Sequence, residues 1–546
     1  MNKRLGFFLF AVFFGSCVLL HYRDLLRPNR SLYLALFRGD PAPRYSFYPW
    51  LLESAKQFHR GYFPLWCDLE GLGMPLLANC QSTPFNPFNL AFEIFPKLRL
   101  LDWLLLLKLF LLGIFTWWFA TELGLSAMAA AGSALIICFS GYVSETINQV
   151  NFNTELWLPA GLLLAERILK NRADLLKFVL LGLVSCLAML GGNPEAAFYF
   201  LLFILLYALV RGGRKKLREV LVICLAFGMG GILSSAQLFS FIEYLGFGWH
   251  IHTNYLHTIG RPPLKWLFSL FFPWIFGLNR THPEQLFMLS YLGLIPVFLA
   301  LFTLSKVSSL KRPAIFFWVY ILVFLALIYR IPPAEFLARL PVMNRIASTK
   351  FAYFGVCFSL ALLAGFGLEY YRKKELRSRE LAIALGLISG LALAALLLAY
   401  RSSVGPVIIR AAWLYPMVLF LIAAALLVAV VGVYTAGANR PPPQGLFAAL
   451  GLSLTWGFFV TLAGPLMVTR IQGRAALSTQ TRRRIVVAWS CLAVGSALAA
   501  GLWAMTAVVE RSLNLLVVGA EGLTAVGVLG LVAWLHSVRA RPPTAP

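Results

Sequence analysis

The sequence is poor in charged residues. They make up only 13% of the 546 residues, whereas about a quarter is usual in soluble domains. Hydrophobic residues reach 60%, and the mean hydropathy is +0.78. This composition excludes a soluble globular protein, a disordered chain and a fibrous protein. It predicts a polytopic membrane protein.

Acidic residues are the scarcer of the two charged classes. The chain has 22 Asp and Glu against 47 Lys and Arg, which gives a net charge of +25. In a membrane protein such an excess reflects the loop charges that set orientation. The basic residues are scattered over short loops rather than gathered on one domain, so we expect no nucleic-acid partner.

Motifs of soluble nucleotide-dependent enzymes are missing. The sequence contains no Walker loop, Rossmann fingerprint, G-x-S-x-G elbow or HExxH helix. An activated substrate would therefore arrive through the membrane. Eight cysteines are too few for a disulfide scaffold in a chain of this length. Cys67 and Cys80 share one polar loop and could pair if that loop is exported.

Long apolar runs are abundant. A membrane-spanning helix needs about 20 mostly apolar residues, and about fifteen runs approach that length. We interpret the first run, which begins at Leu5, as an uncleaved span rather than a signal peptide. The strongest basic clusters begin at Arg211, Lys306 and Tyr371 and fall on the same side as Lys3. Their side is therefore predicted to be the cytoplasm.

This orientation predicts an all-α polytopic membrane protein with a cytoplasmic N-terminus. Three long loops, 22–101, 241–284 and 331–350, fall on the exterior side. Residues 1–380 form the predicted main module, and 381–546 form accessory membrane helices. The accessory region has only two acids, Glu510 and Glu521, and its span count stays open because the basic run ending at Arg484 falls on the exterior side.

The first exterior loop has the most informative pattern. Phe47, Trp50, Leu51, Ala55 and Phe58 recur at helical spacing. This pattern predicts an amphipathic helix over 48–59 that lies on the membrane surface.

Asp40 follows a glycine at the entrance of the same loop. Its carboxylate could act on a lipid headgroup held near the membrane surface. The alternative is that Asp40 only caps a turn.

Other polar groups in the exterior loops admit two interpretations each. Asp68 and Glu70 could hold a divalent cation or lie in a solvated loop. His250, His252 and His257 form a weaker candidate for a metal site, and the alternative is that they are ordinary histidines at the membrane interface.

Arg345 and Lys350 lie just before a long apolar helix in the third exterior loop. Cations at such a boundary could hold a lipid phosphate. The alternative is that they only anchor the loop to the membrane.

Short ordered motifs between Phe37 and Glu369 resemble a known family. They include RGDPAPRYSFYPW, FPLWCDLEGLGMPLLANCQSTPFNPFNL, FSGYVSE with NTELWLPAGLLLAER, GNPEAAFY, SSAQLFSFIEYL, YLGLIPVFLAL and LPVMNRIASTKFAYF with LLAGFGLE. In this order they resemble the YfhO-like bacterial membrane proteins of the GT-C superfamily of integral-membrane glycosyltransferases.

The resemblance implies a GT-C-like helical bundle in the bacterial inner membrane. Such enzymes move a sugar from a polyprenyl-phosphate donor to an acceptor outside the cytoplasm, here a cell-envelope glycan, lipid or protein. The catalytic carboxylate maps onto Asp40, with Asp68 and Glu70 in reserve. Arg345 and Lys350 map onto positions that bind the donor phosphate. No cofactor is required by direct displacement of a phosphate, although a divalent cation is compatible with it.

Five further residues are candidates for the substrate cavity: Arg44, Tyr45, Gln81, Asn193 and Glu195. Asn193 and Glu195 stand where the family often has His and Gln, which is a departure from the family pattern.

Two alternatives come from other functional classes. A lipid or polysaccharide flippase would carry ionisable residues inside its spans, and here Lys108 is one of few. The other alternative is a membrane scaffold without catalysis.

Overall fold

The computed structural model describes the larger of two units of the chain. The described residues are 3–23, 26–35, 41–171, 174–247, 264, 267, 270, 291–304, 312–332, 334–340, 343–346 and 348–373. They all belong to the unit formed by Met1–Trp274 and Asn279–Glu375. Region 381–546, Asp40 and the three loop histidines lie outside the described residues, and so does most of the second exterior loop.

The unit is built of helices. Those up to residue 155 are α1 (Lys3–Tyr22), η2 (Pro43–Phe47), α2 (Tyr48–His59), α3 (Pro87–Ile94), α4 (Leu98–Glu122), α5 (Ala127–Cys138), α6 (Gly141–Thr146) and α7 (Phe152–Glu155). The next group is α8 (Leu158–Asn171), α9 (Leu175–Met189), α10 (Pro194–Gly212), η3 (Gly213–Lys216), α11 (Leu217–Leu233) and α12 (Ser235–Phe247). The last group is α14 (Leu294–Phe302), α15 (Arg312–Ile328), α16 (Glu335–Ala338), η7 (Met343–Arg345) and α17 (Ser348–Arg372).

Side-chain caps fix where several helices begin. Asn86 accepts a hydrogen bond from Phe88 N, at the start of α3. Ser140 and Asp174 cap α6 and α9 in the same manner. Each cap satisfies a backbone N–H that the helix leaves without a partner. The chain therefore turns sharply between its short helices in the region 126–194.

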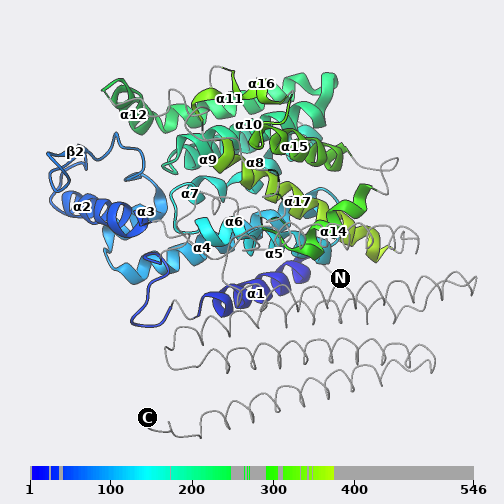
Figure 1. Cartoon of the computed structure of the whole chain (residues 1–546), viewed down its shortest axis with the longest axis horizontal. Helices are drawn as coiled ribbons and strands as arrows, with labels where there is room; N and C mark the ends of the chain where they lie inside the picture. The colour runs from blue at the N-terminus through cyan, green and yellow to red at the C-terminus, as the bar shows by residue number, and fades with distance from the viewer. Residues whose placement is uncertain are drawn as a thin grey trace, which may run out of the picture. The chain divides into compact units, whose positions relative to one another are not determined.

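Helix α17 lies at the centre of the unit. It contacts α5, α14 and α15, and Figure 1 shows it between these helices. The stretch from Phe351 to Phe366 is buried. Its aromatic rings pack against other helices: Phe358 stacks on Phe119 of α4 at 6.3 Å between centroids, and Phe354 lies 5.6 Å from Tyr142.

Among the residues that the structure describes, three helical stretches are long and apolar enough to cross a membrane, namely Leu5–Tyr22, Pro194–Leu233 and Phe351–Tyr370. The second stretch contains α10 and α11, which contact each other on either side of η3. The basic cluster that begins at Arg211 lies at this turn. The coarse prediction of a helical membrane protein is supported by these helices.

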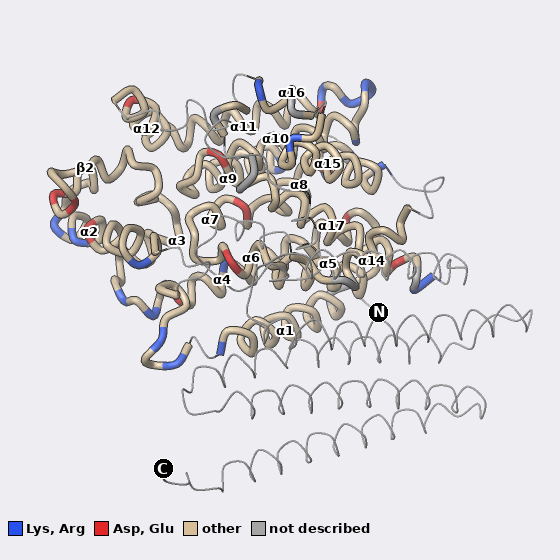
Figure 2. Tube along the Cα trace, in the orientation of Figure 1, with Lys and Arg blue, Asp and Glu red and all other residues tan. Residues whose placement is uncertain are grey.

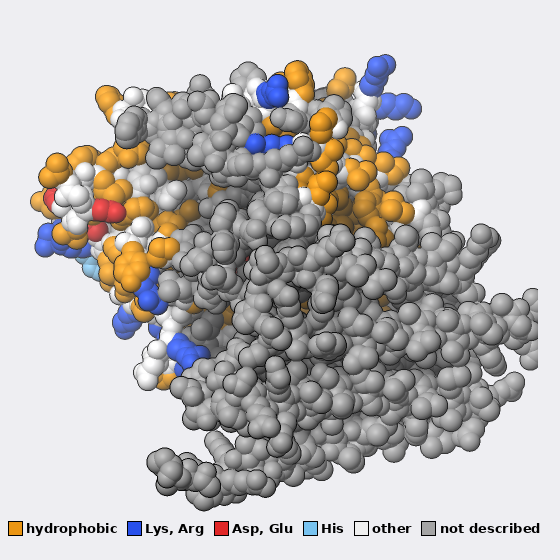
Figure 3. Space-filling model, viewed as in Figure 1, with side chains coloured by type: hydrophobic (Ala, Val, Ile, Leu, Met, Phe, Trp, Pro, Cys, Tyr) orange, Lys and Arg blue, Asp and Glu red, His pale blue; other side chains and the backbone are white. Residues whose placement is uncertain are grey.

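The outer surface of several helices is apolar. On α1, Phe8, Leu9 and Phe13 are exposed, and on α11 Leu221 and Leu225 are exposed one turn apart. Figure 3 shows apolar side chains over much of the visible described surface, and Figure 2 shows basic positions gathered around α2 and near the ends of helices. Large exposed apolar surface is unusual in a soluble monomer, and it suits contact with lipid.

The segment 22–101, which the sequence predicts to be the first exterior loop, is folded onto this bundle. Helix α2 has the predicted bounds and packs on α3. After α2, strands β1 (Trp66–Cys67) and β2 (Met74–Pro75) pair antiparallel, with Trp66 opposite Pro75. In Figure 1, α2, α3 and β2 lie together at one end of the view.

The orientation of α2 differs from the sequence-based expectation. Its apolar residues Trp50, Leu51 and Ala55, and Phe47 just before it, are buried within the protein. They cover α3 and the loop instead of being left for the bilayer surface. Glu53 is also buried, and Lys56 and Gln57 donate hydrogen bonds to its carboxylate at 3.1 and 3.0 Å, which offset the cost of burying it.

Candidate functional site

A polar hollow lies where the segment 22–101 meets helices α4 and α7. We call it the amide hollow, because neutral amide side chains make up much of its lining. Its wall consists of Tyr33, Phe47, Leu51, Gln81, Thr83, Asn89, Leu105, Lys108, Asn148, Gln149, Val150 and Asn153. It encloses about 10 Å³ and reaches about 290 Å³ of free space when its open mouth is included. The enclosed part has room for about one water molecule.

Lys108 supplies the cation of the hollow. It lies in the middle of α4, in the run LLLLKLFLL, and is 4% exposed. Its ammonium donates a hydrogen bond to Asn153 Oδ1 at 2.7 Å and lies 5.1 Å from the centroid of the Phe88 ring. Both partners are uncharged. A buried ammonium group with only neutral partners is costly.

Asn153 links Lys108 to the connection between α9 and α10. Its Nδ2 donates to Gly191 O at 3.2 Å, and Thr154 Oγ1 donates to Ala188 O at 2.8 Å. These bonds tie α7 to the connection between α9 and α10. Because the amide of Asn153 both accepts and donates, its orientation is fixed with the oxygen toward Lys108.

Two adjacent amides leave polar atoms without partners among the described residues. Asn148 Oδ1 and Gln149 Nε2 are buried and have no hydrogen-bond partner there. Asn148 nevertheless holds the first loop, since its Nδ2 donates to Tyr33 O and Ala35 O at 2.9 and 2.8 Å. Both residues line the hollow, so one buried donor and one buried acceptor beside it lack a partner among the described residues.

Asp102 holds the entering chain in place at the base of α4. Ser31 Oγ and Tyr33 N donate to its Oδ1 at 2.7 and 2.9 Å, and Arg99 donates to its Oδ2 at 2.9 Å. The carboxylate is therefore fully paired, and we assign it a structural role. It places Tyr33 at the wall of the hollow.

The turn at 80–83 is strained and clamped. Cys80 and Thr83 adopt positive φ angles of 62° and 50°, which is rare for residues other than glycine and most unusual for a β-branched one. Gln237 Nε2 donates to Cys80 O at 3.1 Å, and Thr83 Oγ1 accepts from Asn89 Nδ2. Such strain persists only where surrounding contacts fix it, often at functional sites. Here it directs Gln81 and Thr83 toward the hollow.

A second buried polar cluster lies behind the hollow. Tyr142 O–H donates to Glu155 Oε1 at 2.5 Å, and Asn151 Nδ2 donates to Glu155 Oε2 at 3.0 Å. Asn151 Nδ2 also lies 3.3 Å from Tyr142 Oη. This cluster joins α6 to α7 and stabilises the segment that presents Asn148 and Gln149.

The candidate cavity residues from the sequence take different local roles. Gln81 lines the hollow, whereas Asn193 is the N-cap of α10 and accepts from Ala196 N at 2.8 Å. Glu195 is half-buried in the first turn of that helix. Arg44 is exposed and donates to Leu34 O at 3.1 Å, and Tyr45 is exposed.

The loop acids are exposed. Asp68 and Glu70 lie in the turns between β1 and β2, and Glu70 accepts a hydrogen bond from Trp50 Nε1 at 2.5 Å. Within the described ranges, no group of three or more His, Cys, Asp or Glu side chains is arranged to hold a metal. The divalent-cation hypothesis for this pair rests on sequence spacing alone. Cys67 and Cys80 are both buried and free.

The two predicted phosphate-binding residues flank the start of α17. Arg345 belongs to η7 and Lys350 to the first turn of α17. Their side chains lie outside what the structure describes. Asp40 is also outside it, but Tyr33 and Phe47, which precede and follow it in the chain, both line the hollow.

Sequence reasoning missed Asn148, Gln149 and Asn153 as site residues. The available signal was the polar run NQVNFNTE, which interrupts an apolar region.

No family model, curated protein or solved structure matches the chain.

Proposed function

We propose that this chain is an integral-membrane glycosyltransferase that uses a polyprenyl-phosphate sugar as donor and acts on an acceptor outside the cytoplasm. The observation that supports the proposal most is the amide hollow. It combines a buried cation with several amides at the point where the first exterior loop docks on the bundle. Amide side chains both donate and accept hydrogen bonds, which suits the hydroxyl groups of a sugar.

In this proposal Asp40 is the catalytic base, as the resemblance to the YfhO-like family implies. Tyr33 and Phe47 bring the chain on either side of it to the wall of the hollow. A carboxylate there would take the proton from the acceptor hydroxyl as the bond to the anomeric carbon forms. Arg345 and Lys350 would stabilise the departing lipid phosphate. Asp68 and Glu70 remain the reserve carboxylates.

The test measures release of polyprenyl phosphate, because this product is common to every sugar. Full-length protein in nanodiscs is supplied with lipid-linked sugars extracted from bacterial membranes and an acceptor extract. Asp40→Asn should lower the rate by about 10² to 10⁴, the usual cost of losing a general base. Asp68→Asn is the matched control and should stay near the parental rate. Parental turnover in Asp40→Asn together with a dead Asp68→Asn would move the base to Asp68.

A flippase is the second candidate, and Lys108 is the observation that favours it. Transporters carry buried ionisable residues inside their spans at the substrate path, and Lys108 lines the amide hollow from the middle of α4. A flippase would move lipid-linked sugar across a vesicle bilayer without releasing polyprenyl phosphate. A scaffold would do neither.

A further inference from the structure

We propose that Lys108, Gln149 and Asn148 form a subsite for a phosphate ester that also carries a hydroxyl group. The inference deepens the proposed function and rests on it for the choice of lipid probe. It concerns side chains other than those of Arg345 and Lys350, which are not among the described residues that line the hollow.

The first argument is the unbalanced charge of Lys108. An ammonium group has three N–H donors. In the described part of the chain, one of them binds the neutral Asn153 Oδ1, and the group also contacts the face of Phe88. A buried charge is usually paired with an opposite charge. An anion entering the hollow would supply that charge.

The second argument is the pair of unused amide atoms. Gln149 Nε2 is a buried donor without a partner in the described residues, and Asn148 Oδ1 is a buried acceptor in the same state. The donor can join Lys108 on a phosphate oxygen, and the acceptor can receive a hydroxyl proton. A ligand with both groups satisfies all three side chains.

The third argument is that two of these three side chains are held in place by other hydrogen bonds. Asn148 is fixed by its bonds to Tyr33 O and Ala35 O, and Lys108 by its bond to Asn153. A preorganised set of donors binds without the cost of ordering side chains. The hollow is open on one side, so a head group can approach the lining from its mouth.

The experiment measures binding to full-length protein in nanodiscs by thermal shift and native mass spectrometry. The probes are a long-chain polyprenyl monophosphate, the corresponding neutral polyprenol and inorganic phosphate. The variants are Lys108→Met and Gln149→Met. Lys56→Met is the control, because Lys56 lies in the first loop and is half exposed, away from the hollow wall.

The wild type should bind the polyprenyl monophosphate more tightly than the polyprenol. Lys108→Met should weaken binding by about ten- to a hundredfold and Gln149→Met by about tenfold, while Lys56→Met should leave it unchanged. Gln149→Met is decisive should Lys108→Met fold poorly. The Gln149 Nε2 donor that this variant removes has no partner among the described residues. Gln149→Met should therefore keep or raise thermal stability while binding the lipid phosphate less tightly.

Inorganic phosphate separates the two sources of the anion. Competition by inorganic phosphate at millimolar concentration would show that the subsite also takes free phosphate esters, and lack of competition would assign it to a lipid head group. Equal binding of polyprenol and its phosphate would overturn the proposal. So would binding that is unchanged in both variants, or a wild type that binds no phosphate probe.

The outcome is distinguishable from failure of the proposed function. Polyprenyl phosphate release is measured in the same preparations. Weakened binding in Lys108→Met without any transfer by the wild type would keep the subsite and reject the glycosyltransferase. Transfer by the wild type with unchanged lipid affinity in both variants would keep the glycosyltransferase and reject the subsite.

Discussion

At the scale of single residues, burial decides which polar groups are special. The exposed acids Asp68 and Glu70 resemble a metal motif in sequence, yet the structure leaves them at the surface of the loop. Lys108 and Glu93 have no motif around them, and both are buried. A polar group removed from water must find partners or change its protonation. The buried groups are therefore the ones with the sharpest consequences.

Glu93 in α3 gives the clearest pH dependence. Burial raises the pKa of its carboxyl from 4.5 to about 7, against the opposing effect of the hydrogen bond from Ser54 Oγ at 2.6 Å. The folded protein then holds a proton that the unfolded chain loses near 4.5. Glu93 therefore adds to the free energy of unfolding below pH 4.5. This contribution, about 3 kcal/mol in total, is lost as the pH rises through the folded pKa of about 7. Stability should thus fall between pH 5 and 8.

Melting of the detergent-solubilised protein at pH 5 and pH 8 measures this effect. Glu93→Gln keeps an acceptor for Ser54 and cannot ionise, so it should flatten the pH dependence relative to the parent. His59, which contacts Glu93 O at 2.8 Å, is present in both proteins and cancels in the comparison. An unchanged pH slope in Glu93→Gln would rule out Glu93 as its source.

At the scale of elements, close approaches hold the loop turn against the bundle. Gly192, between α9 and α10, has a positive φ of 89°. A Cβ there would collide with Thr83 Cγ2 and come within 3.1 Å of Cys80 O. Only glycine allows the connection to pack against the strained turn at 80–83.

Gly192→Ala tests this packing. The left-handed backbone and the collision together should destabilise the protein by about 2–5 kcal/mol. It should also displace Gln81 and Thr83 from the hollow. Gly228→Ala in α11 is the control, because an added Cβ there meets nothing within 4 Å. That control should be neutral or stabilising by up to about 1 kcal/mol, and equal loss in both variants would contradict the packing argument.

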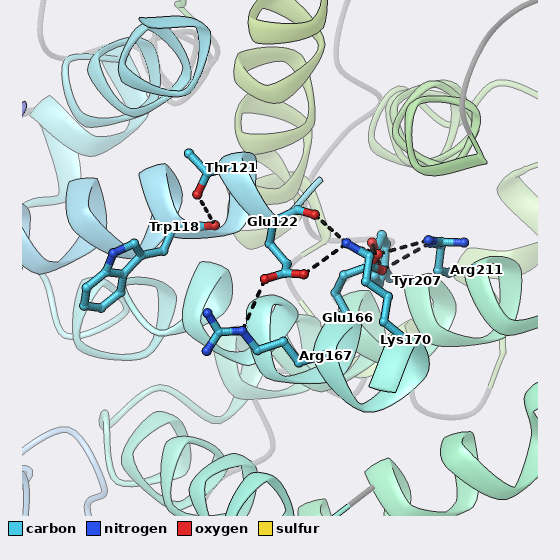
Figure 4. A network of polar contacts seen from close by, with 8 residues as sticks. All are labelled: Trp118, Thr121, Glu122, Glu166, Arg167, Lys170, Tyr207 and Arg211. Carbon is cyan, nitrogen blue, oxygen red and sulfur yellow. Dashed lines mark hydrogen bonds and ion pairs between the residues drawn. The ribbon is translucent and has the colours of Figure 1, made fainter. Parts of the chain in front are cut away.

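A network of ion pairs joins the C-terminal parts of α8 and α10. Glu166 is buried and accepts hydrogen bonds from Tyr207 Oη at 2.7 Å and from Arg211 at 3.0 and 3.2 Å. Lys170 lies 3.3 Å from Glu166 and 3.0 Å from Glu122 of α4. Figure 4 shows the two carboxylates joined through this lysine. Three helices therefore share one electrostatic contact.

Glu166→Ala should destabilise the protein by about 3–5 kcal/mol, because it leaves a partly buried guanidinium and a tyrosine hydroxyl without their acceptor. Glu122→Ala removes a more exposed carboxylate and should cost about 1 kcal/mol or less. Unfolding of both variants in mixed micelles with increasing denaturing detergent measures the difference. Equal effects would show that burial of Glu166 adds nothing.

At the scale of the whole molecule, orientation in the membrane is the main prediction. The basic turn at η3 is expected in the cytoplasm, and the first loop is expected outside. Glu53 is a poor labelling site because it is buried, whereas Tyr62 is 68% exposed and Lys215 is also exposed. A cysteine at position 62 should react with an impermeant maleimide in intact cells. A cysteine at position 215 should react only after lysis, and the reverse pattern would invert the topology.

Much of the architecture follows from the sequence alone. Apolar runs of about 20 residues in a charge-poor chain require helices in a membrane, because their backbone groups must bond internally. The spacing of Trp50, Leu51 and Ala55 predicted helix α2 with the observed bounds. These are local properties, since helix formation depends on neighbours three and four positions away.

The candidate site was decided by tertiary structure. Lys108, Asn148 and Gln149 come from α4 and the segment before α7, and their convergence depends on how α4, α7 and the first loop pack. The apolar face of α2 could equally cover lipid or protein, and only the position of α3 decides that it covers protein. Sequence determined which residues are apolar and helical. Long-range packing alone determined which polar atoms are buried together and which were left without partners.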